Sequence, residues 1–433
     1  MPAITTRPGG HEMKGNDLKL KTTALLCAVL SGPAAQAATS IEDVVRFSGF
    51  GTVGIATSDD NDADYRSNIE QSTGVGFSNN PDSGLDTIFG TQIDIEIAPK
   101  LTATAQIIAR RLSDYNSTRP YFEWANVKYD LNEQTYLRAG RFVAPTFMIS
   151  ESRMIGYAQP TVRPVAEVYL LSPISYMNGV DGGYKFLLGD TLVKLRAGIG
   201  TLNQEINQVN GTLNFKFDIK SFDTTVENGA HAFRVGYQKI SMDVMNDALE
   251  LYDVAMDQLE ANGAANASDI HDRMQRLDVP LDFISLGYMY DDGGLFVQTE
   301  YAIRKFDSDF VQSLDGFYLL GGYHFGKWSP YVSFSKLIHQ DQAEFPALDT
   351  SSIDPGLGGL VTAVNGGSQL LIERDAWTIG VRWDLLSGLA LKAQIDHIIK
   401  PKNTAAEFVN TTNEFFAEER DINVVSAAID FAF

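Results

Sequence analysis

The sequence has little cysteine and no long apolar run. Cys27 is the only cysteine among 433 residues, so the chain cannot form a disulfide within itself. No stretch of about 18 or more consecutive apolar residues occurs, which excludes a membrane-spanning helix of ordinary length. These absences leave a water-soluble protein or a membrane-spanning β-barrel, because the hydropathy signal of a barrel is weak in each strand.

Basic residues are also scarce. The chain has 34 lysines and arginines against 55 aspartates and glutamates, which gives a formal net charge of −21. A protein that binds duplex nucleic acid needs a basic field, and so does a protein that docks on anionic membranes through a polybasic surface. We therefore expect no nucleic-acid partner.

Residues 1–37 have the layout of a secretory signal peptide. A basic stretch from Met13 to Lys21 precedes the apolar segment 24–30, and Ala35-Gln36-Ala37 then forms a small-residue cleavage site. A buried N-terminal helix is the alternative. We expect cleavage after Ala37, with extra residues before Met13, and a single mature domain over 38–433.

Apolar and polar residues alternate along nearly all of the mature chain. In 211–222 every second residue from Leu213 to Ile219 is apolar, and the residues between them are polar or charged. A period of two places successive side chains on opposite faces of a strand. If the apolar face contacts lipid, the residues that face hydrocarbon include Phe217 and Ile379, and those that face water include Lys216 and Arg382.

Sixteen segments follow this pattern, and their connections alternate between short and long. Turns such as Gly189-Asp190 are short, whereas 57–85, 143–177, 240–280 and 340–373 are long. A transmembrane barrel sorts its connections in this way, and sixteen strands enclose an aqueous lumen. The predicted fold is all-β, a 16-stranded antiparallel transmembrane β-barrel with strands at 45–56, 86–97, 101–112, 121–130, 135–142, 178–188, 191–200, 211–222, 230–239, 281–291, 294–305, 315–326, 330–339, 374–385, 389–399 and 422–433.

Four local features resemble the Gram-negative trimeric general porin superfamily. They are Ala139-Gly140-Arg141, the long segment 142–177, Asn178-Gly179-Val180 and the terminal Phe433. The resemblance is architectural and covers the whole mature chain, although 142–177 lacks the Pro-Glu-Phe-Gly of the enterobacterial members. It implies a homotrimer in the Gram-negative outer membrane, surrounded by lipid and lipopolysaccharide, that passes small hydrophilic solutes and ions by passive diffusion. It also implies that 142–177 is a third outer loop that folds inward and constricts the pore.

Basic residues dominate the inward positions predicted for the third to ninth strands. Only Asp181 and Asp218 are inward acids in this region. A one-sided basic wall steers permeant ions across a narrow lumen; the alternative is that these charges only keep the lumen hydrated. We expect a mild preference for anions or carboxylates, carried by Arg110, Lys128, Arg138, Lys194, Arg196 and Arg234, with Lys185, Lys216 and Lys220 as further inward bases.

Two long connections carry further features. The third loop contains Glu151, Arg153, Arg163 and Glu167, and the two glutamates are candidates for the acidic side of the constriction. Segment 242–259 in the fifth outer loop has apolar residues at steps of three and four, from Met242 to Leu259. This spacing predicts an amphipathic helix, and Ser268 can cap a second one.

Glu123 does not fit the predicted register. Strand 121–130 places it on the outward face with Ala125 and Val127. A carboxylate in contact with hydrocarbon is unfavourable. We therefore expect either a position at the outer rim or a β-bulge that turns the side chain inward.

No arrangement of catalytic or metal-binding residues stands out. Asp396 and His397 are adjacent, but neighbouring strand residues point to opposite faces. Sequence signatures of a nucleophile elbow, a metal cluster or a phosphate loop are missing. We expect no enzymatic activity, no cofactor and no metal. The alternatives to a general channel are a solute-specific channel with a ladder of arginines and, from other classes, an outer-membrane hydrolase or an adhesin or receptor barrel.

Overall fold

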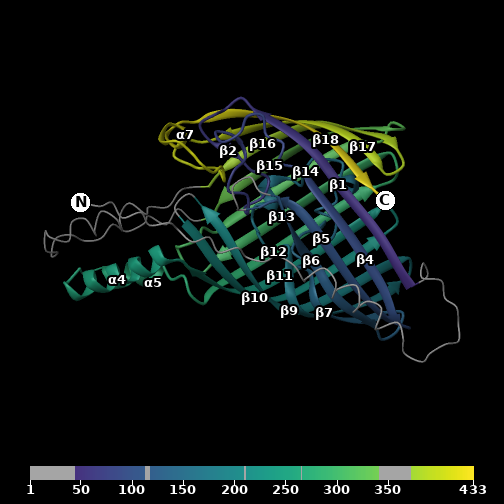
Figure 1. Ribbon diagram of the computed structural model, residues 1–433, viewed down its shortest axis with the longest axis horizontal. Coiled ribbons are helices and arrows are strands. Elements are labelled where there is room, and N and C mark those ends of the chain that lie inside the picture. Colours follow the sequence, from purple (N-terminus) through teal and green to yellow (C-terminus); the bar gives the residue numbers. More distant parts are fainter. Residues whose placement is uncertain (1–43, 113–117, 209–210, 265, 341–371) are drawn as a thin grey trace, which may run out of the picture. The chain divides into compact units, whose positions relative to one another are not determined.

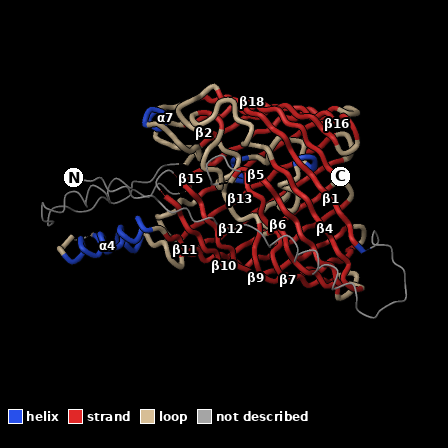
Figure 2. The backbone as a smooth tube through the Cα atoms, viewed as in Figure 1, coloured by secondary structure: helices blue, strands red, loops and turns tan. Residues whose placement is uncertain are grey.

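Sixteen antiparallel strands form one closed barrel (Figure 1, Figure 2). The computed structural model describes residues 44–433 except 113–117, 209–210, 265 and 341–371, so the expected signal peptide lies outside the described residues. The barrel closes where β1 (Val45–Ser58) pairs with β18 (Arg420–Ala432). The other strands are β4 (Ile88–Ala98), β5 (Leu101–Arg111), β6 (Thr118–Asp130), β7 (Thr135–Val143), β8 (Tyr176–Leu188), β9 (Thr191–Gln208), β10 (Gly211–Asn228), β11 (His231–Met245), β12 (Val279–Asp291), β13 (Leu295–Phe306), β14 (Leu314–Tyr323), β15 (Trp328–His339), β16 (Arg374–Leu386) and β17 (Leu389–Lys400).

The predicted sixteen-stranded fold is confirmed, because each predicted segment overlaps one strand of the barrel. Short turns join the strands at one end. Gly189 and Gly229 complete two of them with φ angles of 62° and 55°, in the left-handed region that glycine adopts without strain. The long connections all leave the opposite end of the barrel. The barrel therefore has a turn end and a loop end.

The outward face is apolar over the middle of the barrel. Ile379 is 65% exposed on β16, whereas Arg382 on the same strand points inward and donates to backbone carbonyls of the third loop. Both residues have the orientation predicted from the sequence. Pairing of every strand with two neighbours satisfies the backbone polar groups, as hydrocarbon requires. Other exposed apolar residues of this face are Val53, Ile55, Ile199, Phe222, Val235, Ile395 and Ile429.

The predicted orientation of Phe217 and Lys216 is wrong. Phe217 on β10 points inward and is 2% exposed, and Lys216 points outward, where it lies 3.4 Å from both Asp218 and Asp243. Lys220 is likewise exposed on the outward face. Strands β9 and β10 have 18 residues each, more than the roughly 9–11 that a membrane-spanning strand requires. Their loop ends continue beyond an apolar band and have the polar exterior and apolar interior of a soluble protein.

A β-bulge on β6 explains the position of Glu123. Trp124 pairs with Gln106 and Phe122 with Ile107, so Glu123 is the extra residue between them. Its side chain is buried, near the charges of Arg153 and Arg110. The bulge that the sequence suggested for this position is confirmed, and it keeps the carboxylate away from lipid.

The first, third, fifth and eighth loops contain secondary structure within the described residues. The first loop, 59–87, holds a small sheet of β2 (Asp64–Tyr65) and β3 (Val75–Gly76), and the eighth, 401–419, holds α7 (Asn413–Ala417). The third loop, 144–175, contains the turns η1 (Gly156–Ala158) and α3 (Ala166–Tyr169). None of the helices in the described part of the chain is long and apolar enough to cross a membrane.

The fifth loop contains the predicted helical insertion, as α4 (Asp247–Ala261) and α5 (Ala267–Arg273). The predicted start at Met242 is wrong, because β11 continues to Met245 and buries Met242 inside the barrel. Met256, Leu259 and Ile270 form a separate apolar cluster between the two helices. The spacing of apolar residues thus identified the helix but not the residue at which the strand ends.

Candidate pore and its constriction

The third loop lies inside the barrel and contacts opposite walls. Near its start, the backbone N–H of Met148 donates to Glu300 on β13 at 2.7 Å, and Arg234 on β11 donates to the carbonyl of Pro145. Further along, Val162 N–H donates to Gln394 on β17 at 3.0 Å. Arg382 on β16 donates to the Gln159 carbonyl at 2.9 Å. The loop therefore crosses the lumen from β11–β13 to β16–β17.

Arg163 and Glu167 hold this loop in place. Arg163 forms two hydrogen bonds of 2.7 Å with the carboxylate of Asp86, and a third of 2.7 Å with Asp396 on β17. Glu167 accepts from Arg374 at 2.7 Å, and both partners are buried. The sequence placed Arg163 and Glu167 at the water-filled constriction; the structure places both in buried ion pairs, where they fix the loop.

Glu151 is exposed in the lumen, whereas the guanidinium of Arg153 is largely buried. The Glu151 side chain is 72% exposed and lies 3.5 Å from Arg196 on β9, which is the expected juxtaposition of a loop acid and a wall base. Arg153 points toward Glu123 and Arg110, and its Nη2 has no hydrogen-bond partner among the described residues. Burial lowers the pKa of Arg153, an effect that the carboxylate of Glu123 opposes.

The predicted basic wall is largely neutralised by acids. Arg138 makes two hydrogen bonds to Asp181, at 2.9 and 2.6 Å, and Arg196 makes a third at 2.6 Å to the same carboxylate. Four further wall bases pair individually, and the pairs are Lys194 with Glu227 (2.6 Å), Lys128 with Asp130 (3.2 Å), Arg234 with Asp223 (3.7 Å) and Arg110 with Glu70; Lys185 also lines the turn-side wall.

This pairing corrects the one-sided charge count made from the sequence. The set of inward charged residues loses Lys216, Lys220 and Asp218, because these side chains point outward. Asp223 and Glu227 enter it, because β10 continues to Asn228 and its inward alternation continues with it. The predicted strand ended at residue 222, so these two acids were assigned to a connection. Extending the predicted strand would not have found them, because the predicted register places odd-numbered residues on the outward face; they enter the count only once that register is reversed.

The third loop separates two cavities. The turn-side cavity has a volume of about 700 Å³ and is lined by residues 145–152 of the loop, the turn 132–134, and wall charges that include Lys128 and Arg196. The loop-side cavity has a volume of about 590 Å³ and is lined by residues 171–174 of the loop and by mainly apolar side chains of β10–β13. Of the charged residues predicted for the pore, the turn-side cavity is lined by Lys128, Glu151, Lys194, Arg196 and Arg234.

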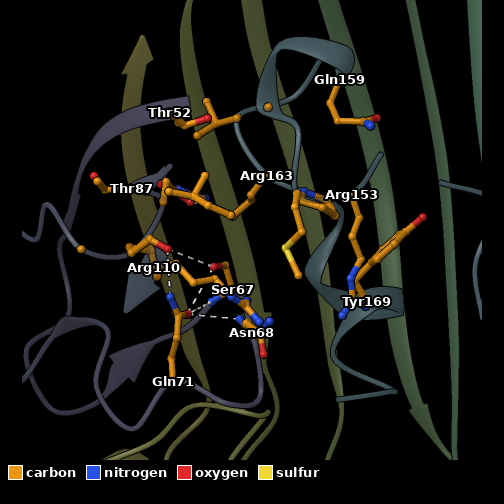
Figure 3. Close-up of a pocket in the computed structure, with 18 residues that line it drawn as sticks. Thr52, Ser67, Asn68, Gln71, Thr87, Arg110, Arg153, Gln159, Arg163 and Tyr169 are labelled. Carbon is orange, nitrogen blue, oxygen red and sulfur yellow. Dashed lines mark hydrogen bonds and ion pairs between the residues drawn. The ribbon is translucent and has the colours of Figure 1, made fainter. Parts of the chain in front are cut away.

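The first loop also enters the lumen, which the sequence did not predict. Glu70 accepts from Arg110 on β5 and from Gln204 on β9, so one carboxylate links two separate parts of the wall. A cavity of about 90 Å³ remains between the first and third loops. In Figure 3, Arg153 and Tyr169 of the third loop lie on one side of this cavity and Gln71 of the first loop lies on the other.

Solved structures with the same architecture are Gram-negative outer-membrane channels. Salmonella typhi OmpF in complex with daunomycin has a TM-score of 0.51 at 10% identity, covering 91% of this chain and 99% of that chain. The outer membrane channel DcaP of Acinetobacter baumannii has a TM-score of 0.51 at 8% identity (92% and 100% covered). The anion-selective porin from Comamonas acidovorans has a TM-score of 0.50 at 12% identity (90% and 99% covered).

This chain has the porin fold. No family model matches the sequence, and no curated protein matches it either. At identities of 8–12% the likeness concerns the fold alone. The architecture predicted from the sequence is therefore shown.

Residues considered for catalysis occupy structural positions in this porin fold. Asp396 points inward and binds Arg163 and Thr378, whereas His397 on the opposite face lies 2.9 Å from Asn423. They do not form a dyad, as the strand geometry predicts. Within the described ranges, no group of three or more His, Cys, Asp or Glu side chains is arranged to hold a metal ion.

Proposed function

We propose that this protein is a passive channel of the Gram-negative outer membrane that passes small hydrophilic solutes and ions. The observation that carries the proposal is a closed barrel with an apolar exterior around a charged, open turn-side cavity of about 700 Å³. Sixteen strands leave an aqueous lumen, and the inward third loop narrows it to a defined path. An enzyme with a buried catalytic group would need neither an open lumen nor a loop that narrows it.

The short turns would face the periplasm and the long loops the exterior. This orientation is supported by the polar outward face at the loop ends of β9–β11, where exposed Lys216 and Lys220 suit water and lipopolysaccharide headgroups better than hydrocarbon. We also propose a homotrimer, by analogy with trimeric porins; the apolar exterior offers surface both to lipid and to neighbouring copies.

For ion preference we propose a mild selectivity for anions or carboxylates. On the described residues of β5–β11, inward bases still outnumber inward acids, but the pairing of Arg138 and Arg196 with Asp181 leaves only a small excess. The exposed acids of the fifth loop are screened beyond about 8 Å at physiological salt, whereas charges inside a narrow lumen are screened less. The wall should therefore outweigh the net charge of −21.

Planar-bilayer recording tests the channel directly. Purified protein should insert with stepwise conductance, in triplets if the trimer forms, and detergent without protein should give none. Under a salt gradient the reversal potential should show weak anion preference. Absence of conductance from correctly folded barrels would contradict the proposal and favour a hydrolase or an adhesin.

A solute-specific channel is a second candidate. The observation that favours it is the entry of two loops into the lumen, the first through Glu70 and the third along its whole length. Liposome-swelling rates distinguish the two. A general channel admits neutral sugars at rates that depend on size alone, whereas a specific channel saturates with its solute.

A further inference from the structure

The loop-side cavity differs chemically from the turn-side cavity of the same barrel. Its wall consists mainly of inward apolar residues on β10–β13, among them Phe217, Met242, Leu281, Phe283 and Phe306. The lumen of a transmembrane barrel is normally polar. A cavity of about 590 Å³ with an apolar wall has the size and character of a site for a small organic molecule.

Arg304 brings a buried positive charge to this cavity, where the carboxylate of Glu407 acts on it without forming an ion pair. It is 6% exposed on β13 and donates at 3.1 Å to two backbone carbonyls, those of Leu171 and Gln312. Its Nε has no hydrogen-bond partner, and no carboxylate in the part of the chain that the structure describes forms an ion pair with it. An unpaired buried charge is unfavourable, so an anion from solution would be stabilised there.

The other charged residues that line the cavity are already paired. Arg66 lies 2.5 Å from Glu407, and Asp309 lies 2.6 Å from Arg273. The cavity therefore combines a large apolar surface with one net positive charge at Arg304. A hydrophobic cation would meet repulsion at this site, and a small hydrophilic anion would leave the aromatic wall without contacts.

We propose that the loop-side cavity binds an organic anion with an apolar body. A carboxylate or sulfonate would accept a hydrogen bond from Nε of Arg304, and the body would pack among Phe217, Phe283 and Phe306. Charge-assisted hydrogen bonds to arginine fix the orientation, and burial of the body supplies most of the affinity. This inference rests on the proposed function in one respect, because it makes the cavity an outer binding station on the path of a permeating solute.

Three fluorescent probes with the same aromatic body test the proposal. Pyrenecarboxylate, pyrenemethanol and pyrenemethylammonium are titrated into the protein in lipid nanodiscs, with empty nanodiscs as the blank for partition into lipid. Saturable binding is expected for the carboxylate, with affinity at least about tenfold weaker for the alcohol and weaker still for the ammonium, since a hydrogen bond to a charged group accounts for such a factor. Equal affinity for the three probes, or no binding above the blank, overturns the proposal without relying on any variant.

Variants locate the site. Arg304→Gln should reduce carboxylate affinity to that of the alcohol, and Arg304→Lys should retain most of it. Lys220→Gln removes an exposed, outward lysine and serves as the matched control, with affinity unchanged. An Arg304→Gln protein that binds the carboxylate as tightly as the unaltered protein overturns the assignment. Bilayer recording of the same preparations separates the two ideas: conductance without probe binding overturns only this inference, and binding without conductance overturns only the proposed channel.

Discussion

Lys392 and Asp430 form an ion pair of 2.7 Å beneath the third loop, with both side chains fully buried. Lys392 also donates to the carbonyls of Gly156 at 2.8 Å and Thr161 at 2.7 Å. The ammonium therefore combines one ion pair with two hydrogen bonds to the loop. A single side chain on β17 thus joins the strand that closes the barrel to the loop that crosses its lumen.

Replacing Lys392 should loosen the third loop. Lys392→Met leaves the buried Asp430 carboxylate without its cation, with only the Thr52 hydroxyl as donor among the described residues, and leaves two loop carbonyls without their donor, which should lower the free energy of unfolding by about 3–5 kcal/mol. Urea denaturation of refolded protein measures this loss, and single-channel recording should show increased open-channel noise. Lys220→Met, on the outward surface, is the control and should change neither. If the open-channel noise of Lys392→Met equals that of the unaltered protein, other contacts of the third loop, such as those of Arg163, are enough to hold it in place.

The two faces of β10 can be distinguished by spin labelling. Phe222 is exposed on the outward face, whereas Phe217 is enclosed in the barrel. A label at Phe222 should be accessible to oxygen dissolved in lipid and a label at Lys216 to a water-soluble relaxant, whereas a label at Phe217 should be inaccessible to oxygen dissolved in lipid. Phe222→Arg should cost about 2–4 kcal/mol if the residue lies near the bilayer midplane. Lipid accessibility at Phe217 would reverse the register described here.

Local alternation was sufficient to predict the strands, their number and the sorting of turns and loops. It was insufficient to predict which face is inward where a strand leaves the membrane. Along β10 the period of two runs without interruption, but its inward residues change from Phe217 and Ile219 to Asp223 and Glu227. The alternation has the same period whether the apolar or the polar residues face inward. Which set faces the lumen depends on whether that part of the strand is surrounded by lipid or by water.

The residues of the constriction were harder to predict for a different reason. Arg163 and Glu167 were identified as charged loop residues, but their partners, Asp86 and Arg374, are 77 and 207 residues distant in the chain. Nothing in local spacing predicts such pairs. Glu70 was missed for the same reason, since its role depends on Arg110 and Gln204 meeting in space. Glu123 was recognised because a misplaced carboxylate violates a local rule.

The mature protein is expected to begin at Ala38. The small-residue site at Ala35-Gln36-Ala37 follows an apolar core of the length that signal peptidase substrates have. N-terminal sequencing of protein extracted from outer membranes checks this expectation. Substituting Ala37 with a bulky residue should slow processing and leave a precursor about 4 kDa larger, by the usual mass of some 110 Da per residue. A mature start before residue 30 would contradict the cleavage assignment.

Ion preference should depend on the group formed by Arg138, Arg196 and Asp181. Two guanidiniums share one carboxylate, so the group carries one net positive charge inside the lumen. Replacing both arginines with alanine leaves Asp181 alone, which reverses the sign of the local charge. The reversal potential under a salt gradient should then move toward cation selectivity by more than it does for either single variant.

Asp181→Asn provides the matched control for this double replacement. It keeps both arginines and removes the acid, so the reversal potential should move in the opposite direction, toward stronger anion preference. Glu151, exposed and 3.5 Å from Arg196, supplies the competing charge from the third loop. If Glu151→Gln changes selectivity more than the wall variants do, the loop and not the wall determines which ions pass. Opposite shifts for Arg138→Ala with Arg196→Ala and for Asp181→Asn, each larger than the shift for Glu151→Gln, would locate the selectivity element on the wall.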